Sequence, residues 1–536
     1  MVVCRLFLLL LLVNGSLFAQ SDRYMVFFKD KNSSPYSISQ PSAFLSAKAI
    51  ARRNHSAIAV TSEDLPVNAA YVNELKLSRP GVRTFFTSRW MNAVLVEASL
   101  ADIAAIRLLP IVSKADLVAP GVKLIGGRLK ELKQKQVNGD APGVTQTQLE
   151  MVGMNTMHSE NIYGEGVTVS ILDSGFPGVN TAVPFQPIFT ENRMKLTKDF
   201  VTNSPNAYQF DKHGTEVFSV IAAQLQGTFL GGAFKANYML FVTEDVSSEY
   251  RIEEYNWLFA AEKADSAGTD VIQSSLGYYD FDDAQMNYTK ANMDGKTTVV
   301  SKAAAMARDR GIIVVVSAGN EGNNAWGIVT APADVDGILA IGAVNTAGVR
   351  TSFSSTGPTA DGRIKPDVVA LGQSTSVILP TGAVSTQSGT SLAAPLITSL
   401  VMGLLQAYPE LTPAEIIQAI KLSANKSNSP DNKLGYGLPH YIAVKNYLES
   451  NKATDDIYIY PNPTDSMLTL SFKKLPDGAV DLSIYDVQGR LLSNPVGSLN
   501  WQLNPVDISL SSLPAGTYLL KVKTSTTIKT FRFVKL

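Results

Sequence analysis

Three polar residues lie far apart along this chain, each at one end of an apolar run, and this arrangement constrains the fold more than any other feature. Asp173 closes the run 167–172, His213 precedes the run 217–223, and Ser391 precedes a long apolar stretch. The first run is rich in β-branched residues and predicts a buried strand, whereas the other two predict buried helices. The three polar residues are therefore expected at the ends of elements that share one core.

These residue types together supply the chemistry of a serine nucleophile. A serine hydroxyl attacks a carbonyl when an imidazole accepts its proton and a carboxylate orients that imidazole. Of the four histidines, only His213 lies in such a setting. Alone, each segment has a simpler interpretation, because Asp-Ser-Gly is a common turn, Gly-Thr-Ser is a helix cap and a lone histidine is more often structural. Their joint occurrence favours a catalytic triad.

Residues 151–447 resemble the subtilase family of serine peptidases. The segments that carry the resemblance are Leu172-Asp173-Ser174-Gly175, His213-Gly214-Thr215, Val316-Ser317-Ala318-Gly319-Asn320-Glu321-Gly322 and Gly389-Thr390-Ser391-Leu392-Ala393-Ala394-Pro395. Their order, Asp then His then Ser, is that of subtilisin. The resemblance implies an α/β fold in which helices flank a subtilisin-like parallel sheet.

The resemblance also implies a role for each site residue. Ser391 is expected to attack the peptide carbonyl, His213 to move the proton and Asp173 to orient His213. Asn320 is expected to donate its amide to the oxyanion, beside the backbone N–H of Ser391. The residues implied to bind substrate are Ser275, Leu276, Gly277, Ala318 and Gly319. The first three follow a predicted strand and are expected to pair with an extended peptide, although Asn and Ser also serve ordinary turns.

Two positions depart from the family pattern. Lys212 stands before His213, where the family most often has glycine, and the segment 231–236 lacks a proline commonly found there. A cation beside the imidazole disfavours its protonated form. Lys212 therefore predicts a low pKa for His213 and an acidic limb of the activity profile at low pH.

The amino-terminal part of the chain is predicted to be removed in stages. Residues 1–19 carry Arg5, an apolar run and Leu17-Phe18-Ala19, the layout of a secretory signal peptide; a buried amino-terminal helix is the alternative. The run is too short to span a bilayer, and no other stretch reaches that length. Cys4 is the only cysteine, so the mature protein is expected to have no disulfide.

Residues 20–119 contain two strand-like and two helical patterns, which predict a small α+β unit. By position this unit resembles the inhibitory pro-segment of a subtilase zymogen; a permanent amino-terminal domain is the alternative. Residues 120–150 are polar and predict an exposed linker where processing occurs. The predicted catalytic domain, 151–447, and a short linker, 448–456, follow.

Residues 457–536 show period-two alternation and turn signals, which predict a compact β-sandwich. This part resembles the carboxyl-terminal sorting domain of cargo for the type IX secretion system of Gram-negative bacteria. The matching segments are Tyr460-Pro461-Asn462-Pro463, Ile484-Tyr485-Asp486-Val487-Gln488-Gly489-Arg490 and Leu513-Pro514-Ala515-Gly516-Thr517-Tyr518. The resemblance implies export through the periplasm and outer membrane to the cell surface or medium. A carbohydrate-binding or adhesive sandwich is the alternative.

Taken together, the sequence predicts a secreted serine endopeptidase that works through an acyl-enzyme on protein or peptide substrates. Alternatives are a catalytically silent surface-binding protein on the same scaffold and a serine esterase. No cofactor is expected to be required; calcium is common in the family, but the sequence identifies no ligand cluster. The net charge of −1 argues against binding to nucleic acid or an anionic membrane, and a monomer is expected.

Overall fold

The computed structural model describes residues 21–121, 143–451, 457–460, 462–464, 466–472, 480–493, 505–525 and 527–536. The predicted signal peptide and most of the predicted processing linker lie outside these residues. The chain divides into two compact units. The smaller unit comprises Met1–Ser37 and Ser62–Gly126, and the larger comprises Ile38–Thr61 and Gly127–Leu536.

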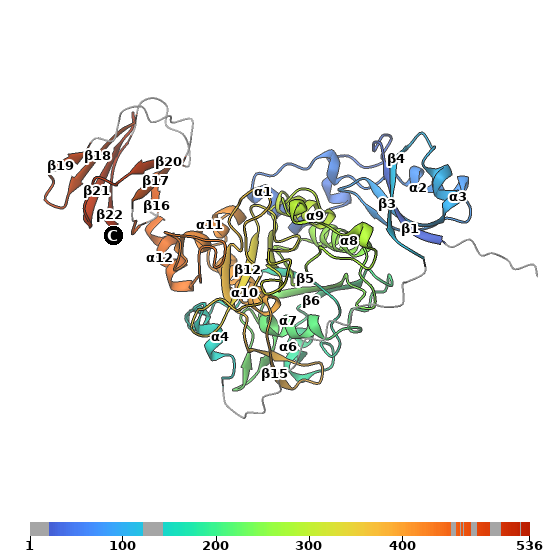
Figure 1. Ribbon diagram of the computed structural model, residues 1–536, viewed down its shortest axis with the longest axis horizontal. Helices are drawn as coiled ribbons and strands as arrows, with labels where there is room; N and C mark the ends of the chain where they lie inside the picture. Colours follow the sequence, from blue (N-terminus) through green and yellow to red (C-terminus); the bar gives the residue numbers. More distant parts are fainter. Residues whose placement is uncertain are drawn as a thin grey trace, which may run out of the picture. The chain divides into compact units, whose positions relative to one another are not determined.

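A seven-stranded sheet forms the centre of the larger unit (Figure 1). In spatial order its strands are β13 (Val368–Leu371), β12 (Leu339–Val344), β11 (Ile313–Ser317), β10 (Val271–Ser274), β5 (Thr168–Asp173), β9 (Asn237–Val242) and β6 (Met194–Asp199). All neighbouring pairs are parallel. The central strands are buried on both faces, which explains why they read as continuous apolar runs in the sequence. The predicted parallel α/β sheet is confirmed.

Helices cover the two faces of this sheet (Figure 1). The main ones are α7 (His213–Ala222), α8 (Ile252–Ala267), α9 (Val299–Arg308) and α10 (Thr390–Ala407). Helices α7 and α10 contact each other, and so do α8 and α9. One apolar core joins Val169 and Ile171 of β5 to Val217 of α7 and Leu396 of α10, so these two helices share one face. The starts of α7 and α10 carry His213 and Ser391, as the sequence predicts.

Shorter elements complete the larger unit. They are α1 (Ala47–His55), α4 (Gln146–Glu150), α5 (Met154–Ser159), α6 (Gln186–Thr190), α11 (Pro413–Ser423) and α12 (Tyr441–Asn451), with the hairpins β7 (Gln224–Leu225) and β8 (Phe229–Leu230), and β14 (Thr375–Ile378) and β15 (Val384–Gln387). The expectation that no stretch after the predicted signal peptide reaches membrane-spanning length is wrong for α10. Within the described ranges, α10 is the one helix with the length and hydropathy of a membrane span, and most of it is buried in the protein.

Helix α1 lies within residues 20–119 of the sequence, is grouped with the larger unit and contacts α8. The guanidinium groups of Arg52 and Arg53 both pair with the carboxylate of Asp265, and the Arg53 Nη2 to Asp265 Oδ2 distance is 2.8 Å. All three side chains are buried. Lys48 Nζ lies 2.6 Å from Asp270 Oδ2 at the edge of the same contact. Buried charge pairs therefore hold α1 on α8 within the larger unit.

The smaller unit is an α+β fold, as predicted, but with four strands where the sequence indicated two. Its antiparallel sheet has the order β2 (Arg83–Ser88), β3 (Ala93–Ser99), β1 (Ser21–Phe28) and β4 (Val112–Ala119). Helices α2 (Ala69–Ser78) and α3 (Leu100–Ile106) contribute Leu75, Ile103 and Ile106 to the core beneath the sheet. Strands β2 and β4 were missed because both mix charged with apolar residues and lack clean alternation.

The carboxyl-terminal residues form the predicted sandwich. One sheet contains β16 (Ile457–Tyr460), β17 (Met467–Phe472) and β20 (Val506–Ser509), and the other contains β19 (Leu491–Ser493), β18 (Asp481–Asp486), β21 (Gly516–Lys523) and β22 (Ile528–Lys535). Leu470 and Ile508 from the first sheet share a core with Ile484, Leu520 and Phe533 from the second. The alternating apolar positions of these strands thus face one another between the sheets.

Candidate active site

Asp173 and His213 form a short, buried pair at the carboxyl end of the sheet. Asp173 is the last residue of β5 and is fully buried, as expected for a polar group placed where parallel strands end. Its Oδ1 lies 2.8 Å from His213 Nδ1 and also accepts the backbone N–H of Ser174 at 2.7 Å. These bonds hold the imidazole in one orientation, with Nδ1 toward the carboxylate and Nε2 away from it.

The groups around His213 are mainly acidic. Burial by itself lowers the pKa of His213, but the Asp173 carboxylate outweighs burial and, with Glu216 and Asp211, raises that pKa to about 9. The predicted low pKa of His213 is therefore wrong. Lys212 Nζ lies 3.0 Å from Glu216 Oε1, so its charge is directed to that carboxylate and not to the imidazole.

Ser391 lies in the first turn of α10, and its side chain is almost fully buried. The position where a side chain would begin on Gly389 lies 3.6 Å from each of three atoms: Asn320 Nδ2, Ser391 N and Ser391 Oγ. The amide of Asn320, the backbone N–H of Ser391 and the Ser391 hydroxyl therefore converge on one small region beside Gly389. Glycine leaves that region open, and two hydrogen-bond donors face it together with the hydroxyl.

The Asn320 side chain is held by the residue before Ser391. Its Oδ1 accepts the backbone N–H and the hydroxyl of Thr390, each at 2.9 Å. Asn320 itself follows β11, which neighbours α10. Since Oδ1 is occupied by Thr390, Nδ2 is the end of the amide that is left to face a ligand.

The segment predicted to bind substrate, Ser275-Leu276-Gly277, follows β10. Ser275 is buried, and its Oγ donates to the carbonyl of Ser391 at 2.9 Å while accepting from Gln273 Nε2 at 2.6 Å. Leu276 and Gly277 are half-buried. The side chain of Ser275 thus supports the backbone of Ser391, so only the peptide backbone of this segment is left for the predicted pairing with a substrate strand.

Ala318 and Gly319 follow the end of β11 beside the same segment. Ala318 is fully buried and fixed by backbone bonds to Ile341 and Thr330. A side chain on Gly319 would begin 2.9 Å from Thr330 Oγ1, and one on Gly277 would begin 2.2 Å from the same atom. Thr330 therefore links the two predicted substrate-binding segments. Gly319 also has φ +104°, a conformation that favours glycine.

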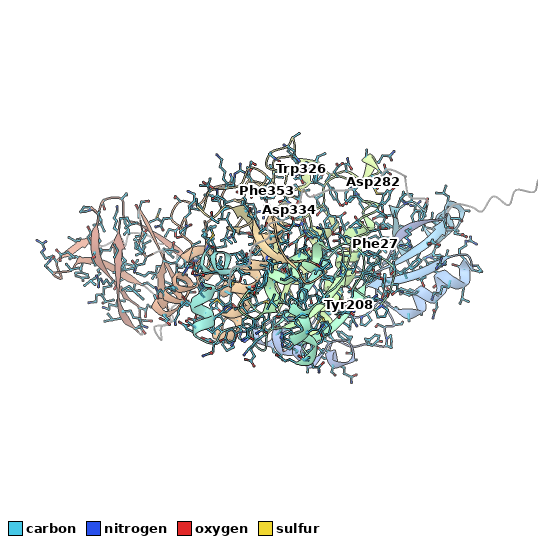
Figure 2. All side chains as sticks on the ribbon, turned by 90° about the horizontal axis from the view of Figure 1, so that it is seen from below. Phe27, Tyr208, Asp282, Trp326, Asp334 and Phe353 are labelled. Carbon is cyan, nitrogen blue, oxygen red and sulfur yellow. The ribbon has the colours of Figure 1, made fainter. Side chains whose placement is uncertain are left out.

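An aromatic pair lies next to these segments. Tyr279 and Trp326 stack with ring centroids 4.3 Å apart, and both line an open pocket. Tyr279 Oη donates to Glu321 Oε2 at 3.0 Å, one residue beyond Asn320. Figure 2 shows Trp326 at the rim of the catalytic domain. This pair was not singled out from the sequence, because neither residue belongs to a motif.

Three supporting residues were also missed. Thr390, Glu216 and Gln273 contact Asn320, Lys212 and Ser275, respectively. Glu216 had a readable signal, because it lies three residues after His213 on one helix and so shares its face. Gln273 is a polar residue inside an apolar strand, which also marks a position that needs a partner.

The remaining histidines lie elsewhere in the larger unit. His158 Nε2 contacts the carbonyl of Gly232 at 2.9 Å, and His55 Nε2 contacts the carbonyl of Leu411 at 3.1 Å. Burial lowers the pKa of His158 and of His440. Each is held in a structural contact that involves neither Asp173 nor Ser391.

Comparison with protein families identifies the chain. The subtilase family matches residues 164–437, slightly more than half of the 536 residues, and the chain belongs to this family of serine peptidases. A peptidase S8 propeptide domain of Bacteroidota matches residues 23–136. A secretion system C-terminal sorting domain matches residues 458–535. The predicted family and both flanking resemblances are confirmed, and the sorting domain indicates a secreted or cell-surface protein.

Curated relatives agree with this assignment. The chain is 30% identical to subtilisin of Bacillus pumilus over 273 residues, which cover 50% of this chain and 87% of the relative. It is 31% identical to subtilisin E of Bacillus subtilis over 273 residues, 50% of this chain and 63% of that protein. The chain thus spans less than two thirds of the full subtilisin E sequence.

Two solved structures are similar to the chain. MycP1 from the ESX-1 type VII secretion system has 19% identity and a TM-score of 0.46, with 60% of this chain and 90% of that chain covered. The prenylagaramide maturation protease PagA has 20% identity and a TM-score of 0.44, with 55% and 98% covered.

Proposed function

We propose that this chain is a secreted serine endopeptidase that cleaves peptide bonds through Asp173, His213 and Ser391. The observation that carries the proposal is the 2.8 Å contact between His213 Nδ1 and Asp173 Oδ1 at the carboxyl end of the parallel sheet in a subtilase domain. A buried carboxylate in this position fixes the imidazole tautomer and stabilises the imidazolium formed during proton transfer.

In the proposed reaction, Ser391 Oγ attacks the scissile carbonyl while His213 Nε2 takes the hydroxyl proton. Asn320 Nδ2 and the Ser391 N–H donate to the oxygen as it becomes negative. His213 then protonates the leaving amine, which departs and leaves an acyl group on Ser391. Water, deprotonated by His213, hydrolyses the acyl-enzyme.

The substrate is proposed to bind as an extended strand. The backbone of residues 275–277 follows a sheet strand and offers groups for pairing with a peptide. Gly319 and Ala318 are proposed to form part of the wall of the pocket for the residue before the cleaved bond. An extended peptide held in this way suits an endopeptidase better than an esterase, whose small substrate needs no strand partner.

The flanking domains are proposed to govern when and where the enzyme acts. The match to a propeptide domain supports synthesis as a zymogen that is cut within or near residues 120–150. The match to a sorting domain supports export as cargo of a type IX secretion system, with later removal of residues 457–536.

Turnover of casein and of a short ester by the secreted protein tests the proposal. We expect casein cleavage that is abolished in Ser391→Ala and in His213→Ala, with the variants still secreted. Rapid ester turnover without casein cleavage would indicate an esterase. No turnover of either substrate by fully processed protein would instead support a silent binding protein.

A further inference from the structure

Three glutamates outside the proposed triad gather at the carboxyl end of β9. Glu244 lies two residues beyond β9, Glu249 lies in the following loop, and Glu253 lies in the first turn of α8. Each offers a carboxylate oxygen, and these oxygens lie within 4.8 Å of one another. We call Glu244, Glu249 and Glu253 the glutamate cluster.

Burial makes the charge of this cluster costly. Glu253 is 1% exposed, and in the described part of the chain neither Glu244 nor Glu253 forms an ion pair with a basic residue. Like charges at this spacing need either protons or a cation between them.

One buried oxygen of the cluster lacks a partner. Glu253 Oε1 accepts the backbone N–H of Asp245 at 3.0 Å. Glu253 Oε2 is buried and has no hydrogen-bond partner among the described residues. A buried carboxylate oxygen without a donor is unusual in a folded protein, and an absent ligand is one physical explanation.

The other two glutamates are held in place by their surroundings. The backbone N–H of Glu249 donates to Asp282 Oδ2 at 3.0 Å, and the N–H of Asp282 donates back to the Glu249 carbonyl at 2.9 Å. Asp282 is labelled in Figure 2. Glu244 Oε1 accepts the hydroxyl of Tyr278. The loop that carries the cluster is therefore fastened before any ligand arrives.

We propose that Glu244, Glu249 and Glu253 bind a divalent cation of the calcium type. Calcium binds oxygens at about 2.3–2.6 Å, so two oxygens on one ion lie at most about 5 Å apart, which the cluster satisfies. Three carboxylates supply three to six of the roughly six to eight oxygens that calcium takes, and water or backbone carbonyls complete the set. The depth of Glu253 suits a small ion better than a bulky basic side chain of a substrate.

A cation at this position would have a structural role beside residues 275–277, the segment proposed to pair with substrate. Val242, two residues before Glu244, is the register partner of Asp173 in the sheet. Tyr278, which bonds Glu244, directly follows the segment 275–277 proposed to pair with substrate. An ion at the cluster would therefore tie the loop after β9 and the start of α8 to both segments.

Calcium titration of the full chain tests the proposal independently of catalysis. The protein is prepared as Ser391→Ala to prevent autolysis, treated with EDTA and titrated with CaCl₂ in a calorimeter. We expect Glu249→Gln and Glu253→Gln to lose one calcium site, or to bind it at least about tenfold more weakly. The exposed Glu165→Gln serves as the charge-matched control and should keep every site.

Thermal unfolding with and without calcium provides the second readout. The stabilisation by calcium should shrink in Glu249→Gln, whose side chain is only half-buried, even if Glu253→Gln fails to fold. Identical calcium stoichiometry and affinity in all folded variants would overturn the proposal. A chain that binds no calcium would also overturn it. In that case, a higher KM of the active Glu249→Gln enzyme for substrates with basic residues only would show that the cluster binds a substrate side chain.

Discussion

The Oδ1 atom of Asn320 accepts two hydrogen bonds from Thr390, one from its backbone N–H and one from its hydroxyl, each at 2.9 Å. Thr390 directly precedes Ser391. The proposed oxyanion donor and the proposed nucleophile are therefore fixed to each other through one buried residue. This link sets the direction of Asn320 Nδ2 before a substrate binds.

Thr390→Val should lower kcat with little change in KM. The substitution keeps the shape of the side chain but removes one of the two bonds to Asn320, and a neutral hydrogen bond contributes about 1 kcal/mol, or roughly fivefold in rate. Steady-state kinetics on a peptide substrate measure the effect. Thr390→Ser keeps the hydroxyl and should restore most of the rate; an equal loss in both variants would argue against this role.

The pH dependence of kcat/KM should place the acidic limb above the ordinary imidazole value of about 6.5 and toward 9. The neutral imidazole is the form that accepts a proton, so a raised pKa moves the loss of activity to higher pH. Glu216→Gln should move the limb to lower pH, because it removes one of the acidic groups that raise the pKa of His213. Glu165→Gln should leave it in place, and a limb below 6.5 in the wild type would contradict the expectation.

The same pKa shift has a consequence for stability. Folding raises the pKa of His213 from 6.5 to about 9. Protonation of His213 therefore stabilises the folded protein fully below about pH 6.5. That contribution should be lost progressively between pH 6.5 and 9. Urea unfolding of Ser391→Ala and of Ser391→Ala with His213→Gln, across this range, measures it: the difference between the two should shrink as pH rises.

Gly319→Ala should impair the enzyme through both backbone strain and crowding. The residue has φ +104°, and a new Cβ would lie 2.9 Å from Ser355 Oγ and from Thr330 Oγ1. Gly166 has φ +83° with open space around it, so Gly166→Ala carries a backbone strain of about 1–2 kcal/mol without crowding. Comparing kcat/KM and unfolding midpoints of the two variants isolates the crowding. Equal behaviour would mean that Thr330 does not limit the space at Gly319.

Asp265→Ala should destabilise the unprocessed chain strongly. It leaves the buried guanidinium groups of Arg52 and Arg53 without their carboxylate, and breaking a buried pair in this way costs about 3–5 kcal/mol. The fluorescence of Trp257, fully buried in α8, reports urea unfolding nearby. Lys48 lies on α1, like Arg52 and Arg53, and Lys48→Ala breaks its more exposed pair with Asp270, which should cost about 0–1 kcal/mol. Similar midpoints for both variants would contradict the buried-pair argument.

Much of this architecture could be predicted because several constraints agreed locally. The run 167–172 is apolar and β-branched, and it is a central strand; the run after His213 is apolar at every turn, and it is a helix buried in the core. The order of the three motif segments identified the family. Period-two alternation was enough to predict the carboxyl-terminal sandwich, since its strands bury one face each.

What the sequence did not provide depends on contacts between distant residues. One exception is local: Lys212 was expected to act on its neighbour His213, but its side chain pairs with Glu216 one helical turn further along α7. The pairing of Arg53 with Asp265 joins residues 212 positions apart. The glutamate cluster was likewise not recognised, because its three members are spaced irregularly and meet only after β9 and α8 are packed.

The most direct test of the proposed triad is the site and rate of reaction with a fluorophosphonate, mapped by mass spectrometry of the processed protein. We predict one adduct, on Ser391, and a rate of labelling that falls by at least about 10³-fold in His213→Ala. An adduct on a different serine, or unchanged labelling of Ser391 without His213, would contradict it.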